Sequence, residues 1–400
     1  MKKKWIWAVW ALALITLWPV MAGAEAGGEP VQVVEYVHSD GADSGAMLEA
    51  YIDVLSDYAG PTARGVGSVG AQLQYANAAL YKTLRPLFEQ VANGQRASTQ
   101  FSLTYEELGL PTSYTAKELG VSAIVDADGN ITAEAKAAAD ARFYPVLKPL
   151  NDALLADCPF ALYWFDKLAG TAVSYYNYSY NAQSVSIWSG ATVDLYYYVA
   201  SEYQAGGPFS FNTGVSATIQ AAVNRAAGIV SQYAAASDYE KLVGYKQAIC
   251  DLTSYNDAAA GGGAAFGNPW QLIWVFDNDP STTVVCEGYA KAFQYLCDLT
   301  DFTDDVTCVS VSGLTDGGAH MWNLVRMPND KVYMVDVTNC DEGKVGSPDF
   351  LFLAGYTSGS VEDGYVFHRD RVEWTETVGN VIYTHWIDAS APDMTTNPKP

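Results

Sequence analysis

Cys286 stands where the sequence changes from an extended pattern to a helical one. Beyond it, apolar residues recur at the spacing of one buried helical face, at Tyr289, Ala290, Phe293, Leu296 and Cys297. We therefore expect Cys286 at the first turn of a helix, where unpaired backbone N–H groups and the positive end of the helix dipole lie. Both favour the thiolate form of a cysteine, which is the nucleophile.

A histidine and an aspartate follow in a predicted β-hairpin. The turn signal Pro-Asn-Asp at 328–330 separates two strand-like runs. We expect a tight pairing such as Arg326 opposite Val332. In that register His320 and Asp336 lie on the same face of the sheet, close enough to interact.

The residues Cys286, His320 and Asp336 would together supply the groups that cysteine catalysis needs. A nucleophilic cysteine requires a base, and the base requires an orienting group. Taken alone, Cys286 is more simply interpreted as a buried core residue, because most free cysteines are small hydrophobic residues. The histidine and the aspartate favour the catalytic interpretation.

Three motifs in the chain carry a resemblance. In order they read Cys-Glu-Gly-Tyr-Ala-Lys-Ala-Phe, His-Met-Trp-Asn-Leu-Val and Tyr-Met-Val-Asp-Val-Thr. The stretch from about Asp238 to Asp341 resembles the transglutaminase-like superfamily, which has a papain-like fold. It is most similar to the secreted bacterial, protease-like branch related to the cytokinesis transglutaminase-like proteins. Met321 stands where that family more often has alanine.

The resemblance implies a fold and a set of roles. The fold is α+β, with the cysteine helix packed on an antiparallel sheet. Cys286 would be the nucleophile, His320 the general base and acid, and Asp336 the residue that orients the histidine. No metal or organic cofactor is implied. Thiol acyl transfer also needs an oxyanion hole, for which the N–H of Cys286 is one natural donor, and Trp270 or Gln271 are candidates for the second.

The N-terminus predicts secretion. Residues 1–26 comprise Lys2-Lys3-Lys4, an apolar run from Trp5 to Met21 and small-residue cleavage patterns, which together are typical of a signal peptide. An uncleaved membrane anchor is the alternative interpretation. We expect a secreted, extracellular protein that has no membrane association after signal cleavage.

Composition limits the partners. The chain has 22 Lys and Arg against 45 Asp and Glu, a formal net charge of −23. Such an acidic protein should avoid nucleic acid. We expect a peptide, protein or cell-wall substrate, and the oligomeric state is left open.

The six cysteines do not form a dense framework or a repeated Cys-x-x-Cys pattern, so a zinc site is not expected. Cys308 and Cys340 are candidates for a disulfide, because both should lie near strand ends. Buried thiols are the simpler alternative.

The chain divides into an N-terminal region (27–212), a catalytic domain (213–387) and a disordered tail (388–400). The N-terminal region should contain helices followed by aromatic strands, at Phe160–Phe165, Ser174–Trp188 and Val193–Tyr203. Ser237 and Glu240 have the spacing of a capping box at the start of a helix.

These observations predict a secreted cysteine acyl-transfer enzyme with a Cys286–His320–Asp336 triad. It would hydrolyse, or transamidate, peptide or carboxamide bonds. The alternative is a non-catalytic extracellular binding module built on a transglutaminase-like scaffold.

Overall fold

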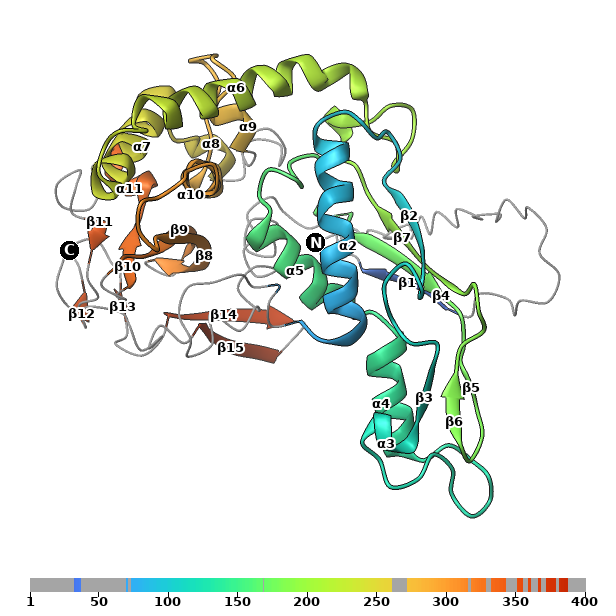
Figure 1. The fold of residues 1–400 in the computed structure, drawn as a ribbon. Helices are drawn as coiled ribbons and strands as arrows, with labels where there is room; N and C mark the ends of the chain where they lie inside the picture. The colour runs from blue at the N-terminus through green and yellow to red at the C-terminus, as the bar shows by residue number, and fades with distance from the viewer. Residues whose placement is uncertain are drawn as a thin grey trace, which may run out of the picture.

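The computed structural model describes residues 32–36, 70, 73–167, 169–260, 272–315, 318–328, 332–342, 351–354, 359–360, 366–367, 372–378 and 381–387. These residues form a mixed α+β structure whose sheets are antiparallel (Figure 1). The expected signal peptide and C-terminal tail lie outside the described residues, and so do the oxyanion candidates Trp270 and Gln271.

The N-terminal region packs helices against a four-stranded sheet. Its helices are α2 (Tyr75–Ala92), α3 (Ala116–Leu119), α4 (Ala133–Phe143) and α5 (Leu147–Asp157). Its main sheet has the order β1-β4-β7-β2, with bounds Gln32–Tyr36, Thr171–Tyr175, Thr192–Tyr197 and Gln100–Thr104. A smaller sheet is formed by β3 (Ser113–Thr115), β6 (Ser184–Ser186) and β5 (Ser179–Tyr180).

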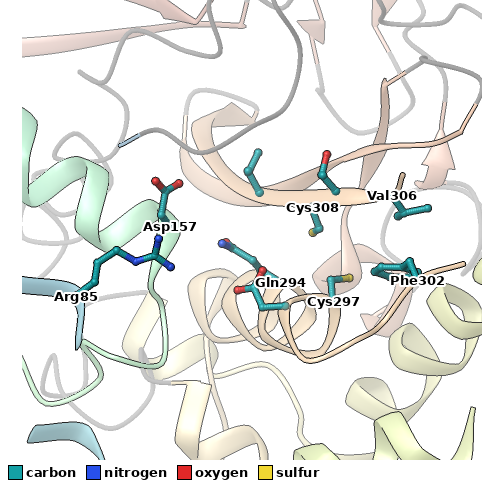
Figure 2. Close-up of a pocket in the computed structure, with 10 residues that line it drawn as sticks. Arg85, Asp157, Gln294, Cys297, Phe302, Val306 and Cys308 are labelled. Carbon is teal, nitrogen blue, oxygen red and sulfur yellow. The ribbon is translucent and has the colours of Figure 1, made fainter. Parts of the chain in front are cut away.

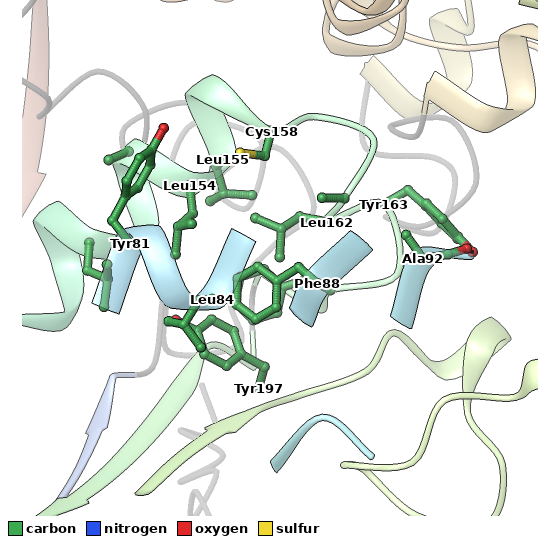
Figure 3. Packing of buried hydrophobic residues seen from close by; sticks show 14 of the residues in the cluster. Tyr81, Leu84, Phe88, Ala92, Leu154, Leu155, Cys158, Leu162, Tyr163 and Tyr197 are labelled. Atoms are coloured by element: carbon green, nitrogen blue, oxygen red, sulfur yellow. Dashed lines mark hydrogen bonds between the residues drawn. The ribbon is translucent and has the colours of Figure 1, made fainter. Parts of the chain in front are cut away.

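One face of α2 forms the centre of this region. Leu80, Leu84, Phe88 and Val91 recur at helical spacing, and all of them are fully buried. Phe88 meets Tyr197 of β7 edge to face, with ring centroids 4.7 Å apart (Figure 3). Burial of each such side chain stabilises the fold by roughly 1.5–3 kcal/mol, so this face holds helix and sheet together.

The prediction of a strand at Phe160–Phe165 is wrong, since the segment consists of turns. Its backbone forms hydrogen bonds between residues three positions apart, from Tyr163 N–H to Phe160 O and from Phe165 N–H to Leu162 O. Most of its side chains are buried, so the segment has no polar face. The same apolar pattern fits a buried strand and a buried turn equally well.

The C-terminal half contains the remaining elements. Its helices are α6 (Ser216–Gln232), α7 (Asp238–Leu252), α8 (Asp257–Ala260), α9 (Leu272–Val275), α10 (Cys286–Asp298) and α11 (Val337–Glu342). A four-stranded sheet has the order β11-β10-β9-β8, with bounds Phe352–Ala354, Val332–Val335, Gly318–Arg326 and Thr307–Thr315. Two hairpins follow, β12 (Gly359–Ser360) with β13 (Val366–Phe367) and β14 (Val372–Val378) with β15 (Val381–Ile387).

Helix α10 lies between the other helices and this sheet, and α6 runs from the N-terminal region to α7 (Figure 1). Every residue of α10 from Cys286 to Cys297 is buried. Gly288 is required in its first turn, because a Cβ there would lie 2.6 Å from the Cβ of Val284. The close approach brings the extended segment before Cys286 against the helix that follows it.

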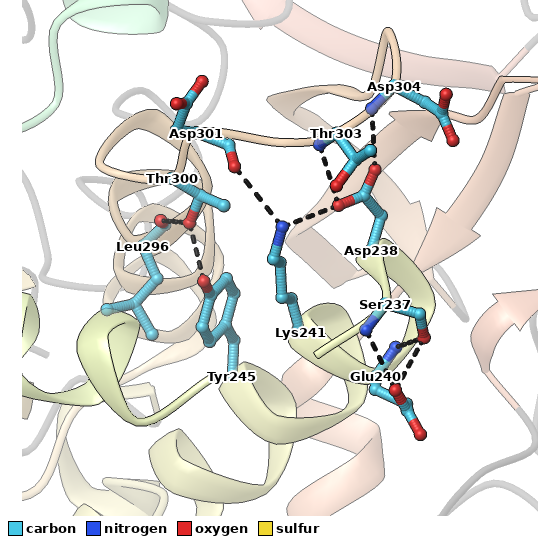
Figure 4. Close-up of polar contacts among 10 residues, drawn as sticks. All are labelled: Ser237, Asp238, Glu240, Lys241, Tyr245, Leu296, Thr300, Asp301, Thr303 and Asp304. Atoms are coloured by element: carbon cyan, nitrogen blue, oxygen red, sulfur yellow. Dashed lines mark hydrogen bonds and ion pairs between the residues drawn. The ribbon is translucent and has the colours of Figure 1, made fainter. Parts of the chain in front are cut away.

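A polar network at the start of α7 holds the loop between α10 and β8 (Figure 4). The predicted capping box is confirmed, with the Ser237 hydroxyl and the Glu240 carboxylate each accepting from the other's backbone N–H. The buried Asp238 carboxylate accepts from the backbone N–H groups of Thr303 and Asp304, and from Lys241 Nζ at 2.8 Å.

None of the helices in the described part of the chain combines the length and the apolar character that a membrane span requires.

Candidate active site

The candidate nucleophile is the first residue of α10. Val285 before it is extended and provides no side-chain cap. Cys286 therefore lies where the helix dipole is positive, as its sequence context predicts. Its side chain is buried, at 1% exposure.

His320 projects from β9 toward both predicted partners. Its Nε2 lies 2.7 Å from Oδ2 of Asp336. The side chain of Cys286 is close enough to help raise the pKa of His320. The hairpin register is the expected one, with Val332 opposite Arg326. The structure thus brings together all three residues that the sequence singled out as a possible triad.

Asp336 has two functions in this geometry. It follows β10 and precedes α11, where its Oδ1 accepts the backbone N–H of Asn339 as an N-cap does. Its Oδ2 accepts from the Asn339 amide at 2.6 Å as well as from His320. The carboxylate is therefore fixed by the start of a helix, independently of the histidine.

Burial and charge act in opposite directions on this pair. Burial alone would lower the pKa of His320, but the Asp336 carboxylate and Cys286 outweigh it and raise that pKa. Burial alone would raise the pKa of Asp336, but His320 and the two Asn339 donors outweigh it and lower that pKa. Both shifts favour an imidazolium beside a carboxylate.

Trp322 covers the histidine. The two residues are next-but-one neighbours on β9, and their rings stack with centroids 5.8 Å apart and an interplanar angle of 25°. Trp322 is itself buried. The indole thus limits the access of water to the imidazole, which strengthens its interaction with Asp336.

A charged cluster lies directly behind the nucleophile. Glu287 is fully buried and pairs with Lys291 one turn along α10. It also pairs with Lys167 of the N-terminal region, whose Nζ lies 2.7 Å from Glu287 Oε1. Burial lowers the pKa of Lys167 well below its ordinary value, although Glu287 opposes this shift.

Sequence reasoning missed Asn339 and Lys167. Asn339 had a local signal, because an aspartate followed three positions later by a polar residue suits a helix start. Lys167 had none, since it lies 120 residues from Glu287 along the chain.

Among the residues that the structure describes, no cluster of histidine, cysteine, aspartate or glutamate is arranged to hold a metal ion. The three grouped side chains are instead a thiol, an imidazole and a carboxylate, with the imidazole hydrogen-bonded to the carboxylate and next to the thiol. Such an arrangement is able to transfer acyl groups by nucleophilic attack.

Comparison with solved structures gives weak similarity. No protein-family model matches the sequence, and no curated protein matches it. A solved structure described as the crystal structure of a TGase is similar at 14% sequence identity and a TM-score of 0.24. The match covers 49% of this chain and 49% of that structure.

Proposed function

We propose that this protein is a cysteine acyl-transfer enzyme that hydrolyses peptide or carboxamide bonds. The proposal rests chiefly on one observation, the buried grouping in which Cys286 lies beside His320 and His320 is hydrogen-bonded to Asp336. The three motifs that resemble the secreted bacterial branch of the transglutaminase-like superfamily support the same reaction. The N-terminal pattern supports a secreted protein, for which peptides, proteins or cell-wall peptides are the fitting substrates.

The geometry suggests a sequence of steps. Because Nε2 of His320 is bonded to Asp336, Nδ1 is the nitrogen left to exchange a proton with Cys286. The thiolate attacks the carbonyl carbon and forms an S–C bond, and the imidazolium gives its proton to the departing amine as the C–N bond breaks. Water then attacks the thioester while His320 takes a proton from it, and the S–C bond breaks to release a carboxylic acid.

The test measures how fast iodoacetamide labels each cysteine, by peptide mass spectrometry from pH 5 to 9. We expect Cys286 to label fastest despite its 1% exposure, and His320→Ala to remove that advantage. Cys158 and Cys250 are internal controls, because burial raises the pKa of each thiol to about 12. His385→Ala, on β15, is the matched histidine variant and should leave the labelling rate of Cys286 unchanged.

A second measurement separates catalysis from reactivity. Wild-type protein should hydrolyse amide bonds in a peptide and wall-fragment library, and Cys286→Ser should not. If Cys286 labels no faster than the control thiols, or labels only after denaturation, the enzyme proposal fails. A non-catalytic binding module would then be the better interpretation.

A further inference from the structure

A pocket of about 220 Å³ lies on the opposite end of α10 from the nucleophile (Figure 2). The last turn of α10 and the beginning of β8 form one side of it. Arg85 and Asp157 of the N-terminal region form another. Nothing in the proposed reaction uses this pocket.

Two cysteines face one another at its wall. Cys297 belongs to the last turn of α10 and Cys308 to the start of β8. Their side chains are 5% and 8% exposed, and their thiols are neighbours in the wall of the pocket. Figure 2 shows both sulfur atoms directed toward the space between helix and strand. Burial and the neighbouring Cys297 raise the pKa of Cys308 well above its ordinary value.

We propose that Cys297 and Cys308 form a disulfide when the protein meets a disulfide oxidant. Because the pKa of Cys308 is raised, the first attack falls to Cys297, whose thiolate attacks the oxidant's S–S bond and forms a mixed disulfide with release of one thiol. The second cysteine then attacks the mixed disulfide, which closes the Cys297–Cys308 bond and releases a second thiol. The protein loses two electrons and two protons, and the oxidant gains both.

The fold favours this pair over the Cys308–Cys340 pair considered from sequence. Cys308 is on β8, while Cys340 is on α11 after β10, and β9 lies between those strands. The cysteine beside Cys308 is therefore Cys297, not Cys340. Cys250 Sγ instead contacts Val337 O, and Cys158 lies near Arg85.

The bond would connect the helix that begins with Cys286 to the strand next to the one that carries His320. Helix α10 begins with Cys286, and β8 pairs with β9, which carries His320. A cross-link at the far end of α10 would restrict movement of this helix against the sheet. It would also close the loop between α10 and β8 in the unfolded chain, which raises stability. The cross-link does not depend on the proposed acyl transfer.

The experiment incubates purified protein with oxidised glutathione or with dithiothreitol, then denatures it in excess iodoacetamide. After oxidation we expect Cys297 and Cys308 to be protected from alkylation and their two peptides to appear as one linked pair in a non-reducing digest. The oxidised protein should also melt roughly 5 °C or more above the reduced one. Six alkylated cysteines, a glutathione adduct alone or a different linkage would overturn the proposal.

Variants locate the bond and separate it from catalysis. Cys308→Ser and Cys297→Ala should each remove the linked peptide pair, whereas the matched control Cys250→Ser should retain it. Cys286→Ser should also retain it, so failure of the proposed enzyme activity leaves this result unaffected. The digest of the wild-type protein tests the disulfide by itself, so the result does not depend on whether any variant folds.

Discussion

At the scale of single residues, Asp336 is the best-supported part of the site. Its side chain accepts two hydrogen bonds from Asn339 and one from His320. The two Asn339 donors therefore hold the buried carboxylate independently of the histidine. A buried carboxylate held in this way keeps both its charge and its direction.

Asn339→Ala should therefore weaken the site without removing any of the three grouped residues. Losing the amide donor of a buried, charged hydrogen bond should lower the free energy of unfolding by about 1.5–3 kcal/mol. We also expect alkylation of Cys286 to slow several-fold, because His320 loses a fixed partner. Asn93→Ala is the matched control, since its exposed amide bonds only to Glu89 O. Equal alkylation rates across pH for Asn339→Ala and wild type would contradict a positioning role.

The His320–Asp336 pair should make stability depend on pH in a defined window. Because the folded pKa of His320 is raised, its contribution is complete below about pH 6.5 and is lost as pH rises through the folded value. Because the folded pKa of Asp336 is lowered, its contribution is present above about pH 3.9 and is lost as pH falls through the folded value. The pair should stabilise most between those limits.

Urea unfolding of wild type and of His320→Gln, from pH 3 to 10, measures how much the His320–Asp336 pair stabilises the protein at each pH. The difference in free energy of unfolding should be largest between about pH 4 and 6.5 and should shrink on both sides. His385→Gln serves as the control and should track wild type. A difference that does not vary with pH would mean that the pair is not ionised in the folded protein.

At the scale of elements, the loop between α10 and β8 is held by Asp238 of α7. Burial would raise the pKa of this carboxylate, but Lys241 and the N–H groups of Thr303 and Asp304 outweigh burial and lower it. Its contribution is therefore present above about pH 3.9 and is lost as pH falls through the folded value. Helix α10 and strand β8 thus depend on α7 for their connection.

Asp238→Asn should lower the free energy of unfolding by about 2–4 kcal/mol at pH 7, because Lys241 loses its buried partner. The difference in the free energy of unfolding between Asp238→Asn and wild type should become smaller as the pH approaches 3. The exposed residue Asp128 provides the control Asp128→Asn, which should stay within about 0.5 kcal/mol of wild type. A constant gap from pH 7 to pH 3 would show that the charge of Asp238 is not what stabilises the loop.

The sequence predicted elements whose signals are local. The hairpin register at Arg326 and Val332 and the capping box at Ser237 were both correct. These features depend on residues a few positions apart, where turn chemistry and capping leave a readable pattern. The turns at Phe160–Phe165 were missed because full burial removes the alternation that distinguishes a strand.

At the scale of the whole molecule, the N-terminal region contacts the helix that carries Cys286. Phe160 stacks on Tyr295 of α10, with ring centroids 5.1 Å apart. Lys167 pairs with Glu287, the residue directly after Cys286. No sequence pattern predicted these contacts, because long-range packing of single side chains has no period. They suggest that the N-terminal region supports the geometry of the site.

Lys167→Met tests whether that support reaches the nucleophile. Methionine keeps most of the length of lysine but removes its charge, so Glu287 would lose the ion pair with Lys167 and keep the one with Lys291. We expect the free energy of unfolding to fall by about 1–3 kcal/mol, since one partner of a buried pair is lost. Alkylation of Cys286 should slow, because Glu287 lies in the same helical turn. Lys136→Met removes an exposed pair with Asp140 and should cost less than about 0.5 kcal/mol with an unchanged alkylation rate. If Lys167→Met behaves like this control, the N-terminal region contributes nothing to the site through Lys167.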